Sequence, residues 1–325
     1  MAKVSILVAV YNAEKYLPKC LDSLVNQSLA DIQIICIDDG STDESLPILQ
    51  QYSKADHRID VIALDQNKGQ AKARNEGLKI AHGQYVCFLD SDDWFSSDAL
   101  ACMVSVFEKY PQTDCVLFHV INWQSGHKVE YPMKSFEVKS GQEAFEDSLT
   151  WKIHGVYGVR KELHLQFPYD TSAQAFSDDN TTRLHYLYAS EVRCCDGIYY
   201  YRVNPNSVTH AVNVHRFDYL KANESMKQQL IQLNLSKRIL DIYENVRWLN
   251  MVGVYMFYFQ HRQKLSEADR NYGLSEIRRV WRTIEIERLT VKNKTKFGYI
   301  PFNKSWLLFR IQEEVYFTLR QWLNR

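Results

Sequence analysis

Apolar and polar positions in the first 110 residues follow two alternating patterns. Short continuous apolar runs, which predict strands buried on both faces, alternate with stretches whose apolar positions recur at helical spacing. The predicted strands are Val4–Val10, Ile32–Ile37, Ile59–Leu64 and Tyr85–Leu89. The predicted helices are 13–26, Glu44–Ser53, Gly69–Ala81 and Asp98–Tyr110. This alternation predicts an α/β fold, with a mainly parallel sheet flanked by helices.

The pattern is less regular beyond Tyr110. It predicts strands at Cys115–Val120, Val192–Cys195 and Ile198–Arg202, and an antiparallel excursion at Glu130–Val138. It also predicts helices at Gly141–Thr150 and from Phe176–Asn180 through Ala189. From about residue 216 the pattern is nearly all helical, with two amphipathic helices over 216–265 and another over 266–289. We therefore expect one domain over residues 1–215 and a mostly helical C-terminal extension over 216–325.

Composition narrows the class of protein. Hydrophobic content of 46% and charged content of 24% exclude a disordered chain. The formal net charge of +0 gives no overall attraction to nucleic acid, so we expect no nucleic-acid partner. The seven cysteines form an odd number without metal-ligand spacing, as free thiols of a reducing compartment do. No signal peptide and no apolar run of membrane-spanning length is found, so we expect a cytoplasmic protein.

Three carboxylates, Asp90, Asp92 and Asp93, follow the predicted strand Tyr85–Leu89 directly. Crowded carboxylates repel one another and lose solvation, so a cation or several hydrogen-bond donors are expected beside them. Asp90 and Asp92 share one face of an extended chain, and hard oxygen ligands suit Mg²⁺ or Mn²⁺ that is also held by the phosphates of a nucleotide. The alternative is a polar turn before the next helix, with Ser96 or Ser97 as its N-cap.

Polar residues follow two other predicted strands. Tyr11 ends the first strand region, and Asp38 and Asp39 end the second. In mainly parallel sheets, ligands bind beyond the carboxyl ends of the strands. We therefore expect Tyr11, Asp38/Asp39 and Asp90/Asp92 to converge on one edge of the sheet and form a site.

Four motifs occur in order along this region. They are Val8–Asn12, Ile37–Asp43, Asn67–Gly69 with Ala73–Gly77, and Gly83–Trp94. Taken together they resemble the family 2 glycosyltransferases, which are inverting enzymes with the GT-A nucleotide-sugar fold. The motifs cover about residues 3–110, with weaker agreement to about 210. The resemblance implies a nucleotide-binding half over 1–110 and an acceptor half over 111–215.

The resemblance also implies roles in holding the nucleotide. Asp39, or its neighbour Asp38, would accept a hydrogen bond from N3–H of uracil, since a carboxylate is an acceptor only. Tyr11 would pack against the base, Asp43 would serve the base or ribose, and Asn12 belongs to the same site. The alternative for Asp38–Asp43 is a tight turn followed by a helix cap.

The diphosphate and the metal involve a second set of residues. Gly69 would let the backbone approach the ligand, while Lys68 and Arg74 would place positive charge near the diphosphate, unless they lie on a solvated helix face. Asp90 would contact the ribose or the metal, with Ser91 beside it. Asp92 would ligate the Mn²⁺ or Mg²⁺ that bridges the diphosphate, in a DxD motif.

Inverting transfer needs a general base opposite the leaving group. The family usually supplies it from a Glu-Asp pair that opens a helix, and here the matching pair is Asp178-Asp179. We take Asp179 as the base and Asp178 as its support; a helix cap is the alternative. His210 lies where some relatives place a metal or diphosphate ligand, although a lone histidine is more often structural or exposed.

The tail from Arg288 mixes basic and aromatic side chains. They are Arg288, Lys292, Lys294, Lys296, Lys304 and Arg310, with Phe297, Tyr299, Phe302, Trp306 and Phe309. Such a mixture is typical of segments that contact an anionic membrane surface, so one hypothesis is peripheral contact at the inner face of the membrane. The alternative is a helical cap on the catalytic domain or a contact between copies.

The resemblance implies a metal-dependent inverting glycosyltransferase of hexosyltransferase type that serves surface polysaccharide biosynthesis. It would transfer a sugar, most simply from a UDP-sugar, to a glycan or lipid-linked glycan acceptor. The alternative is a non-catalytic nucleotide-sugar or glycan-binding module on the same fold. A dinucleotide-binding oxidoreductase is disfavoured, because no Gly-x-Gly-x-x-Gly follows the first strand.

Overall fold

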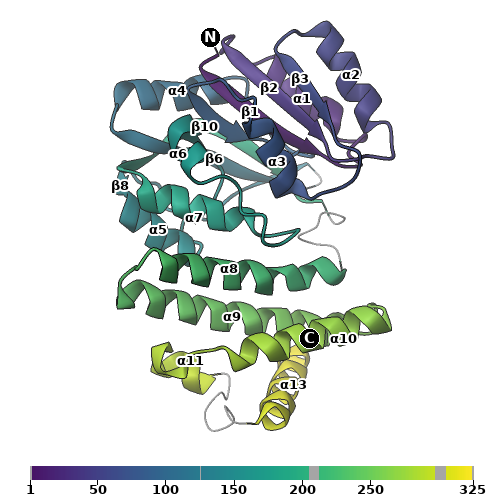
Figure 1. Cartoon of the computed structure of the whole chain (residues 1–325), viewed down its shortest axis with the longest axis vertical. Coiled ribbons are helices and arrows are strands. Elements are labelled where there is room, and N and C mark those ends of the chain that lie inside the picture. Colours follow the sequence, from purple (N-terminus) through teal and green to yellow (C-terminus); the bar gives the residue numbers. More distant parts are fainter. Residues whose placement is uncertain (1, 125, 205–211, 297–304, 324–325) are drawn as a thin grey trace. The chain divides into compact units, whose positions relative to one another are not determined.

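The computed structural model describes residues 2–124, 126–204, 212–296 and 305–323 (Figure 1). The chain divides into two compact units, Met1–Pro205 and Asn206–Arg325. The first unit is built around a sheet, and the described part of the second is helical. The functional division into a nucleotide-binding half, an acceptor half and a helical region stays a prediction.

One mixed sheet forms the first unit, in the order β3-β2-β1-β4-β9-β6-β10-β5, with β7 paired to β6 and β8 paired to β10. Its strands are β1 (Val4–Val10), β2 (Ile32–Asp38), β3 (Ile59–Ala63), β4 (Tyr85–Phe88), β5 (Trp94–Phe95), β6 (Thr113–Gln124), β7 (His127–Glu130), β8 (Lys139–Ser140), β9 (Tyr157–Arg160) and β10 (Glu191–Arg202). Parallel pairing joins β1 to β2 and β4, β2 to β3, and β6 to β10. Because β9 is antiparallel to both β4 and β6, six of the described strands run in one direction, which confirms the mainly parallel sheet.

Helices pack around this sheet (Figure 1). They are α1 (Leu17–Val25), α2 (Ser45–Ala55), α3 (Gln70–Leu78), α4 (Ala99–Lys109), α5 (Gly141–Leu149), α6 (Lys161–Gln166) and α7 (Asp178–Tyr188). Among their contacts, α3 packs on β1 and β2, and α4 packs on β6 and β10. Every residue of β2 is buried, so both of its faces are covered. This burial explains why the central strands are continuous apolar runs rather than alternating ones.

Two predictions beyond Tyr110 are corrected by the structure. The excursion at Glu130–Val138 is wrong, because the strand is β7 at His127–Glu130 and the chain leaves it before Pro132, which has no N–H to donate to a ladder. The strands predicted at Val192–Cys195 and Ile198–Arg202 are one strand, β10, whose register against β6 shifts between Cys194 and Ile198. Strand β9 and helix α6 are not predicted by the sequence pattern.

The second unit consists of helices with their own core. They are η1 (Val214–Phe217), α8 (Asp218–Gln232), α9 (Lys237–His261), α10 (Glu267–Arg282), η2 (Ile286–Arg288), α11 (Val291–Lys296) and α13 (Trp306–Leu323). The core includes the fully buried side chains Trp248, Met251 and Tyr255 of α9, with Phe217 and Phe309 packed beside them. The helical nature predicted for this region is confirmed for its described residues.

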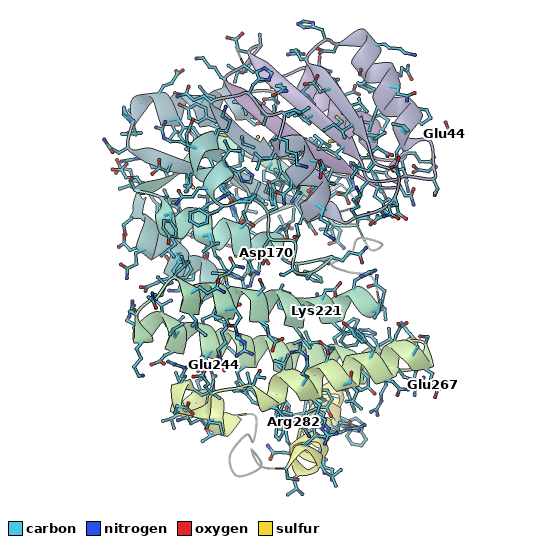
Figure 2. All side chains as sticks on the ribbon, viewed as in Figure 1. Glu44, Asp170, Lys221, Glu244, Glu267 and Arg282 are labelled. Atoms are coloured by element: carbon cyan, nitrogen blue, oxygen red, sulfur yellow. The ribbon has the colours of Figure 1, made fainter. Side chains whose placement is uncertain are left out.

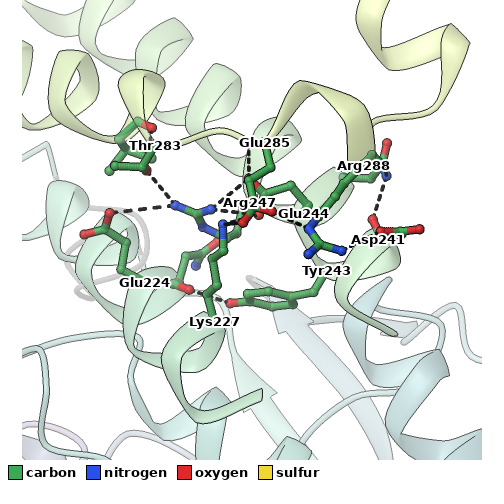
Figure 3. A network of polar contacts seen from close by, with 12 residues as sticks. Glu224, Lys227, Asp241, Tyr243, Glu244, Arg247, Thr283, Glu285 and Arg288 are labelled. Atoms are coloured by element: carbon green, nitrogen blue, oxygen red, sulfur yellow. Dashed lines mark hydrogen bonds and ion pairs between the residues drawn. The ribbon is translucent and has the colours of Figure 1, made fainter. Parts of the chain in front are cut away.

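A buried network of charges joins α8, α9 and the segment that follows α10 (Figure 3). Arg247 donates to both carboxylate oxygens of Glu244 at 2.9 and 2.8 Å, and the two side chains are each 1% exposed. Arg247 also donates to Thr283 at 2.9 Å, and Lys227 pairs with Glu244 at 3.0 Å. Since each buried charge has an opposite partner, the network can be buried without leaving one uncompensated.

The aromatic residues of the tail lie partly inside this helical unit. Phe309 and Phe317 of α13 are buried in its core, and the ring of Trp306 lies 5.4 Å from that of Trp281. Of the predicted tail residues, Phe297, Tyr299, Phe302 and Lys304 fall outside the described residues. Within the described part of the chain, no helix has both the length and the apolar character needed to cross a bilayer. Contact with a membrane stays a prediction.

Helix α13 also places a carboxyl group in this apolar core. Glu313 lies between Phe309 and Phe317 on the buried face and is 0% exposed. Neither of its carboxyl oxygens has a hydrogen-bond partner among the described residues. Burial raises the pKa of Glu313 to about 8 from its ordinary value of 4.5, because the charged form loses its solvation. The folded protein therefore holds a proton here that the unfolded chain releases above pH 4.5.

We predict that Glu313 lowers the free energy of unfolding as the pH rises from about 4.5 to about 8. Above that range, Glu313 should add no further dependence on pH. Replacing Glu313 with leucine should raise the free energy of unfolding at pH 8 by about 1–3 kcal/mol and flatten this dependence. Urea unfolding across the pH range measures both effects. The matched control Glu287→Leu, at an exposed position, should change neither. An unchanged pH dependence in Glu313→Leu would contradict the assignment.

Candidate active site

The turn after β2 places two buried carboxylates side by side. Asp38 and Asp39 are each 2% exposed. Both oxygens of Asp39 are used within the chain, because they accept the backbone N–H groups of Lys68 at 2.7 Å and Gly69 at 2.8 Å. Burial raises the pKa of Asp39, and these two hydrogen bonds oppose that shift. Asp39 therefore fixes the turn that leads into α3.

Asp38 keeps unused hydrogen-bonding capacity. Its Oδ2 accepts the backbone N–H of Ser41 at 3.2 Å. Its Oδ1 is buried and has no hydrogen-bond partner among the described residues. A buried acceptor without a donor is unfavourable, and native structures usually satisfy it with protein, water or a ligand. Of the two neighbouring aspartates, Asp38 is thus the one that can still accept a donor.

The loop after β1 is tied to the loop after β2. Asn12 adopts a positive φ of 49°, which asparagine tolerates better than most residues. Its backbone N–H donates to Ser41 Oγ at 3.0 Å, and its side-chain oxygen accepts the N–H of Thr42 at 2.8 Å. Tyr11, just before it, is 49% exposed. The pairing of the loops leaves the Tyr11 ring available to pack against a ligand.

Asp43 organises the start of α2. Its carboxylate accepts the backbone N–H of Ser45 at 3.0 Å and that of Glu14 at 3.1 Å. Partial burial would raise the pKa of Asp43, but hydrogen bonds from Ser45 and Glu14 outweigh it and lower the pKa. The contacts of Asp43 therefore hold the turn before α2 and the first residue of that helix.

Arg74 connects the end of β4 with the start of α7. The side chain is 1% exposed and donates to Asp90 Oδ1, which also accepts Gln70 Nε2 at 2.7 Å. On its other side, Arg74 lies 3.5 Å from Asp178 Oδ2, and its guanidinium lies 4.1 Å from the ring centre of Phe88. The alternative that Arg74 occupies a solvated helix face is therefore wrong. Two of the predicted site carboxylates, far apart in sequence, meet at this one cation.

The surroundings of Asp90 disfavour its charged form. Burial, with added repulsion from Asp92 and Asp178, raises its pKa to about 6, although the Arg74 charge opposes the shift. Its backbone N–H donates to the hydroxyl of Tyr199 at 3.3 Å. The strand end thus presents a carboxylate that is held in place but is not fully neutralised.

Asp93 is the site residue whose role the sequence did not indicate. It is 1% exposed, and its two oxygens accept the Tyr199 hydroxyl and the Arg202 backbone N–H, both at 2.7 Å. Burial and the charges of Asp90 and Asp92 raise its pKa well above the ordinary value. Asp93 therefore connects the loop that follows β4 to strand β10 through these two hydrogen bonds. The sequence did contain one clue to this role of Asp93. Tyr199 lies in a strand predicted to be buried, and a buried tyrosine hydroxyl needs a hydrogen-bond partner.

Asp92 is more open than its neighbours. Its Oδ2 accepts Asn204 Nδ2 at 3.3 Å, while Arg202 Nε donates only to its backbone carbonyl, at 2.7 Å. Asp92 is half-buried, as is Ser91 before it. In the described residues no group of three or more His, Cys, Asp or Glu side chains is placed to hold a metal ion. His210, the third predicted ligand, lies outside the described residues.

The donor set at Asp92 fits a divalent cation that takes further ligands from a diphosphate. Its carboxylate oxygens are hard ligands, and its hydrogen bonds to the described residues are few and long. Mg²⁺ in particular is usually bound by one or two carboxylates together with substrate phosphates. Asp90 is less suited, because its Oδ1 already accepts Arg74 and Gln70.

Helix α7 presents Asp178 and Asp179 in its first turn. Burial and the neighbouring Asp178 charge raise the pKa of Asp179 to about 7, although Arg183 opposes the shift. The segment before the helix is anchored by Asp170, labelled in Figure 2, which accepts Asn180 Nδ2 at 2.7 Å. The start of α7 is thus anchored, and it carries in Asp179 a carboxyl group whose pKa is raised toward neutrality.

Helix α3 and the glycine before it, Gly69, lie against the segment that precedes α7. The side chain of Asn75 pairs with the backbone N–H and carbonyl of Tyr169, both at 2.9 Å. Gly69 has a φ of +91°, and an added Cβ would meet Gln174 at 3.3 Å, so both conformation and space favour glycine. The Lys68 side chain is exposed, so of the two predicted cations only Arg74 is built into the interior.

The sequence of this chain is similar to those of known glycosyltransferases. The sequence profile described as "Glycosyl transferase family 2" matches residues 5–162. The chain is 37% identical over 207 residues to a poly(ribitol-phosphate) beta-glucosyltransferase of Bacillus spizizenii, which covers 62% of this chain and 32% of that protein. It is 35% identical over 221 residues to the uncharacterized glycosyltransferase EpsJ of Bacillus subtilis, which covers 63% of this chain and 62% of EpsJ. The chain thus spans less than two thirds of either relative.

A solved structure shows the same fold. The crystal structure of S. aureus TarS 1-349 in complex with UDP-GlcNAc matches 97% of this chain and 89% of that chain, with a TM-score of 0.69. The two sequences are 18% identical. At this level of identity the match shows the fold, an α/β sheet unit with a helical C-terminal region, as the sequence predicted.

We predict that Arg74→Met destabilises the first unit by about 3–5 kcal/mol, because it leaves Asp90 and Asp178 without their shared counter-charge. Chemical denaturation of the full chain, followed by the fluorescence of its tryptophans, measures the loss. The control Lys79→Met removes an exposed cation just after α3 and should change stability by less than about 0.5 kcal/mol. Equal stability of the two variants would show that Arg74 is not required for this link.

Proposed function

Residues 5–162 belong to glycosyl transferase family 2, and on that premise we propose that the chain transfers a sugar from a nucleotide-sugar donor to a hydroxyl of a glycan, with inversion at the anomeric carbon. The observation that carries the proposal is the Arg74 bridge. It links Asp90, at the strand edge where nucleotides bind in α/β folds, to Asp178, beside the predicted base. This bridge supports the proposal that a donor site and a proton acceptor belong to one site.

The donor is proposed to be a UDP-sugar. The unpaired Asp38 Oδ1 suits the N3–H of uracil, and the exposed Tyr11 ring is available to the base. Cytosine presents an acceptor at the same ring position and would leave Asp38 without a donor. The presence of UDP-GlcNAc in the crystal structure of TarS supports this choice for a chain of the same fold.

The residues divide the chemistry as follows. The acceptor hydroxyl attacks the anomeric carbon on the face opposite the nucleoside diphosphate; the new C–O bond forms as the bond to the phosphate oxygen breaks. Asp179 takes the proton of that hydroxyl, and its pKa of about 7 suits a base that works near neutral pH. Asp178 supports it through its charge and its contact with Arg74.

Asp92 is the proposed protein ligand for Mn²⁺ or Mg²⁺. Such an ion, when bound, supplies positive charge to the leaving diphosphate. Asp90 lies beside Asp92 and orients the strand end through Gln70 and Arg74. Asp93 keeps this loop attached to β10.

The proposed acceptor is a glycan or lipid-linked glycan of a bacterial surface polysaccharide. Support comes from relatives whose names include a poly(ribitol-phosphate) glucosyltransferase and a putative teichuronic acid biosynthesis glycosyltransferase of Bacillus subtilis. The second matches 30% of this chain at 46% identity.

We predict that Asp179→Asn lowers turnover of UDP-GlcNAc or UDP-glucose by a factor of about 10²–10⁴ and leaves UDP affinity within about twofold. Release of UDP, with and without added acceptor glycans, measures turnover, and calorimetry measures affinity. In the wild type, kcat/KM should rise with pH to a plateau above about pH 7, because Asp179 can accept a proton only after losing its own.

The exposed Asp196→Asn serves as the matched control and should behave as the wild type. UDP binding without turnover in the wild type, unchanged in Asp179→Asn, would instead identify a non-catalytic nucleotide-sugar-binding module.

A further inference from the structure

Trp151 occupies a backbone conformation that favours glycine. It follows α5 and its C-cap, Thr150, and has a φ of +59°. Helices commonly end on a residue in this left-handed region, but that residue is usually glycine or asparagine. A bulky aromatic residue with positive φ is an outlier, and such outliers cluster at ligand sites. The helix end itself gives no reason for a tryptophan here.

The Trp151 backbone is tied to a neighbouring side chain, and its ring remains exposed. The residue is 44% exposed. The Arg183 guanidinium lies 5.8 Å from the centre of its ring, and the Tyr131 hydroxyl donates to its backbone carbonyl at 3.5 Å. The Trp151 backbone is thus tied to Tyr131, and its exposed indole, with a cation near the ring, presents an apolar surface to solvent.

The contacts of Trp151 lead to the proposed base. Arg183 is one helical turn after Asp179 on α7 and is 4% exposed. The charge of Arg183 acts on Asp179, and the charge of Asp179 acts on Tyr131. Arg183, beside the Trp151 ring, and Tyr131, bonded to the Trp151 carbonyl, are thus also electrostatic neighbours of Asp179.

We propose that Trp151 is a platform on which one pyranose ring of the acceptor glycan stacks, so that an acceptor hydroxyl lies toward Asp179. The C–H groups on the apolar face of a pyranose carry partial positive charge and pack on the electron-rich face of an indole. Neutral, ring-containing sugars are the ligand class that such a surface takes. This inference rests on the proposed function, because it assigns the acceptor side of the same site.

The experiment uses the full chain labelled with 5-fluorotryptophan and followed by fluorine NMR. The seven tryptophans give separate signals, and Trp151→Phe assigns the one of interest. Methyl β-D-glucopyranoside, methyl N-acetyl-β-D-glucosaminide and cellobiose are titrated in the presence of UDP, with glycerol as a polyol that lacks a ring. The expected result is a saturable shift of the Trp151 signal by at least one sugar and no shift by glycerol, while the buried Trp248 signal stays fixed.

Trp151→Gly separates a binding role from a structural one. Glycine relieves the positive φ, so the melting temperature should not fall, while sugar affinity and the acceptor KM should each worsen by about tenfold. Donor hydrolysis in water should be unchanged. The control Leu165→Ala removes another exposed apolar side chain and should leave sugar binding unaltered.

Two outcomes overturn the inference. One is a Trp151 signal that no pyranoside shifts although UDP binds, which leaves the proposed function standing. The other is a Trp151→Gly variant that melts earlier and loses donor hydrolysis and sugar binding together, which indicates a structural residue. If the sugars shift Trp151 but no nucleotide binds, the platform is supported and the proposed transferase function fails instead.

Discussion

The structure of this site depends on one buried positive charge. Arg74 lies between Asp90 at the end of β4 and Asp178 at the start of α7, and hardly any of its surface is exposed. A buried guanidinium requires opposite charges, and buried carboxylates that repel each other require a cation. The charge of Arg74 therefore offsets the cost of burying the two aspartates, and their charges offset the cost of burying Arg74. This mutual requirement draws α7, which begins about 100 residues later in the chain, to the edge of the parallel strands.

Environment then gives chemically similar carboxylates different tasks. Asp39 and Asp93 accept hydrogen bonds from the chain and hold loops together, whereas Asp38 retains an oxygen without a donor. Asp92 remains accessible, and Asp179 has a pKa near neutrality because it is buried beside another carboxylate. In the proposed function, this separation leaves some carboxylates to hold the loops and others for the chemistry, since perturbed pKa values cluster at functional sites.

Much of the fold followed from the sequence because its signals are local. Buried strands gave continuous apolar runs, and the carboxylates at strand ends were next to those runs. The turn that Asp39 holds, the bridge from Arg74 to Asp178 and the link from Asp93 to Tyr199 could not be derived this way, since each depends on a contact between residues 29 to 106 positions apart. Short strands such as β7, paired to β6 alone, and β9, between β4 and β6, also escaped prediction, because pairing with neighbours rather than apolar pattern defines them.

The most direct test of this account is calorimetric titration of the chain with UDP, GDP and CDP, each with and without Mn²⁺, in the wild type and in Asp92→Asn. The account predicts that UDP binds best, that Mn²⁺ strengthens its binding, and that Asp92→Asn abolishes the effect of Mn²⁺ while the fold is retained. Failure of all three nucleotides to bind, with or without Mn²⁺, would contradict it. The carboxylates around Arg74 would then serve a purpose other than sugar transfer from a nucleotide.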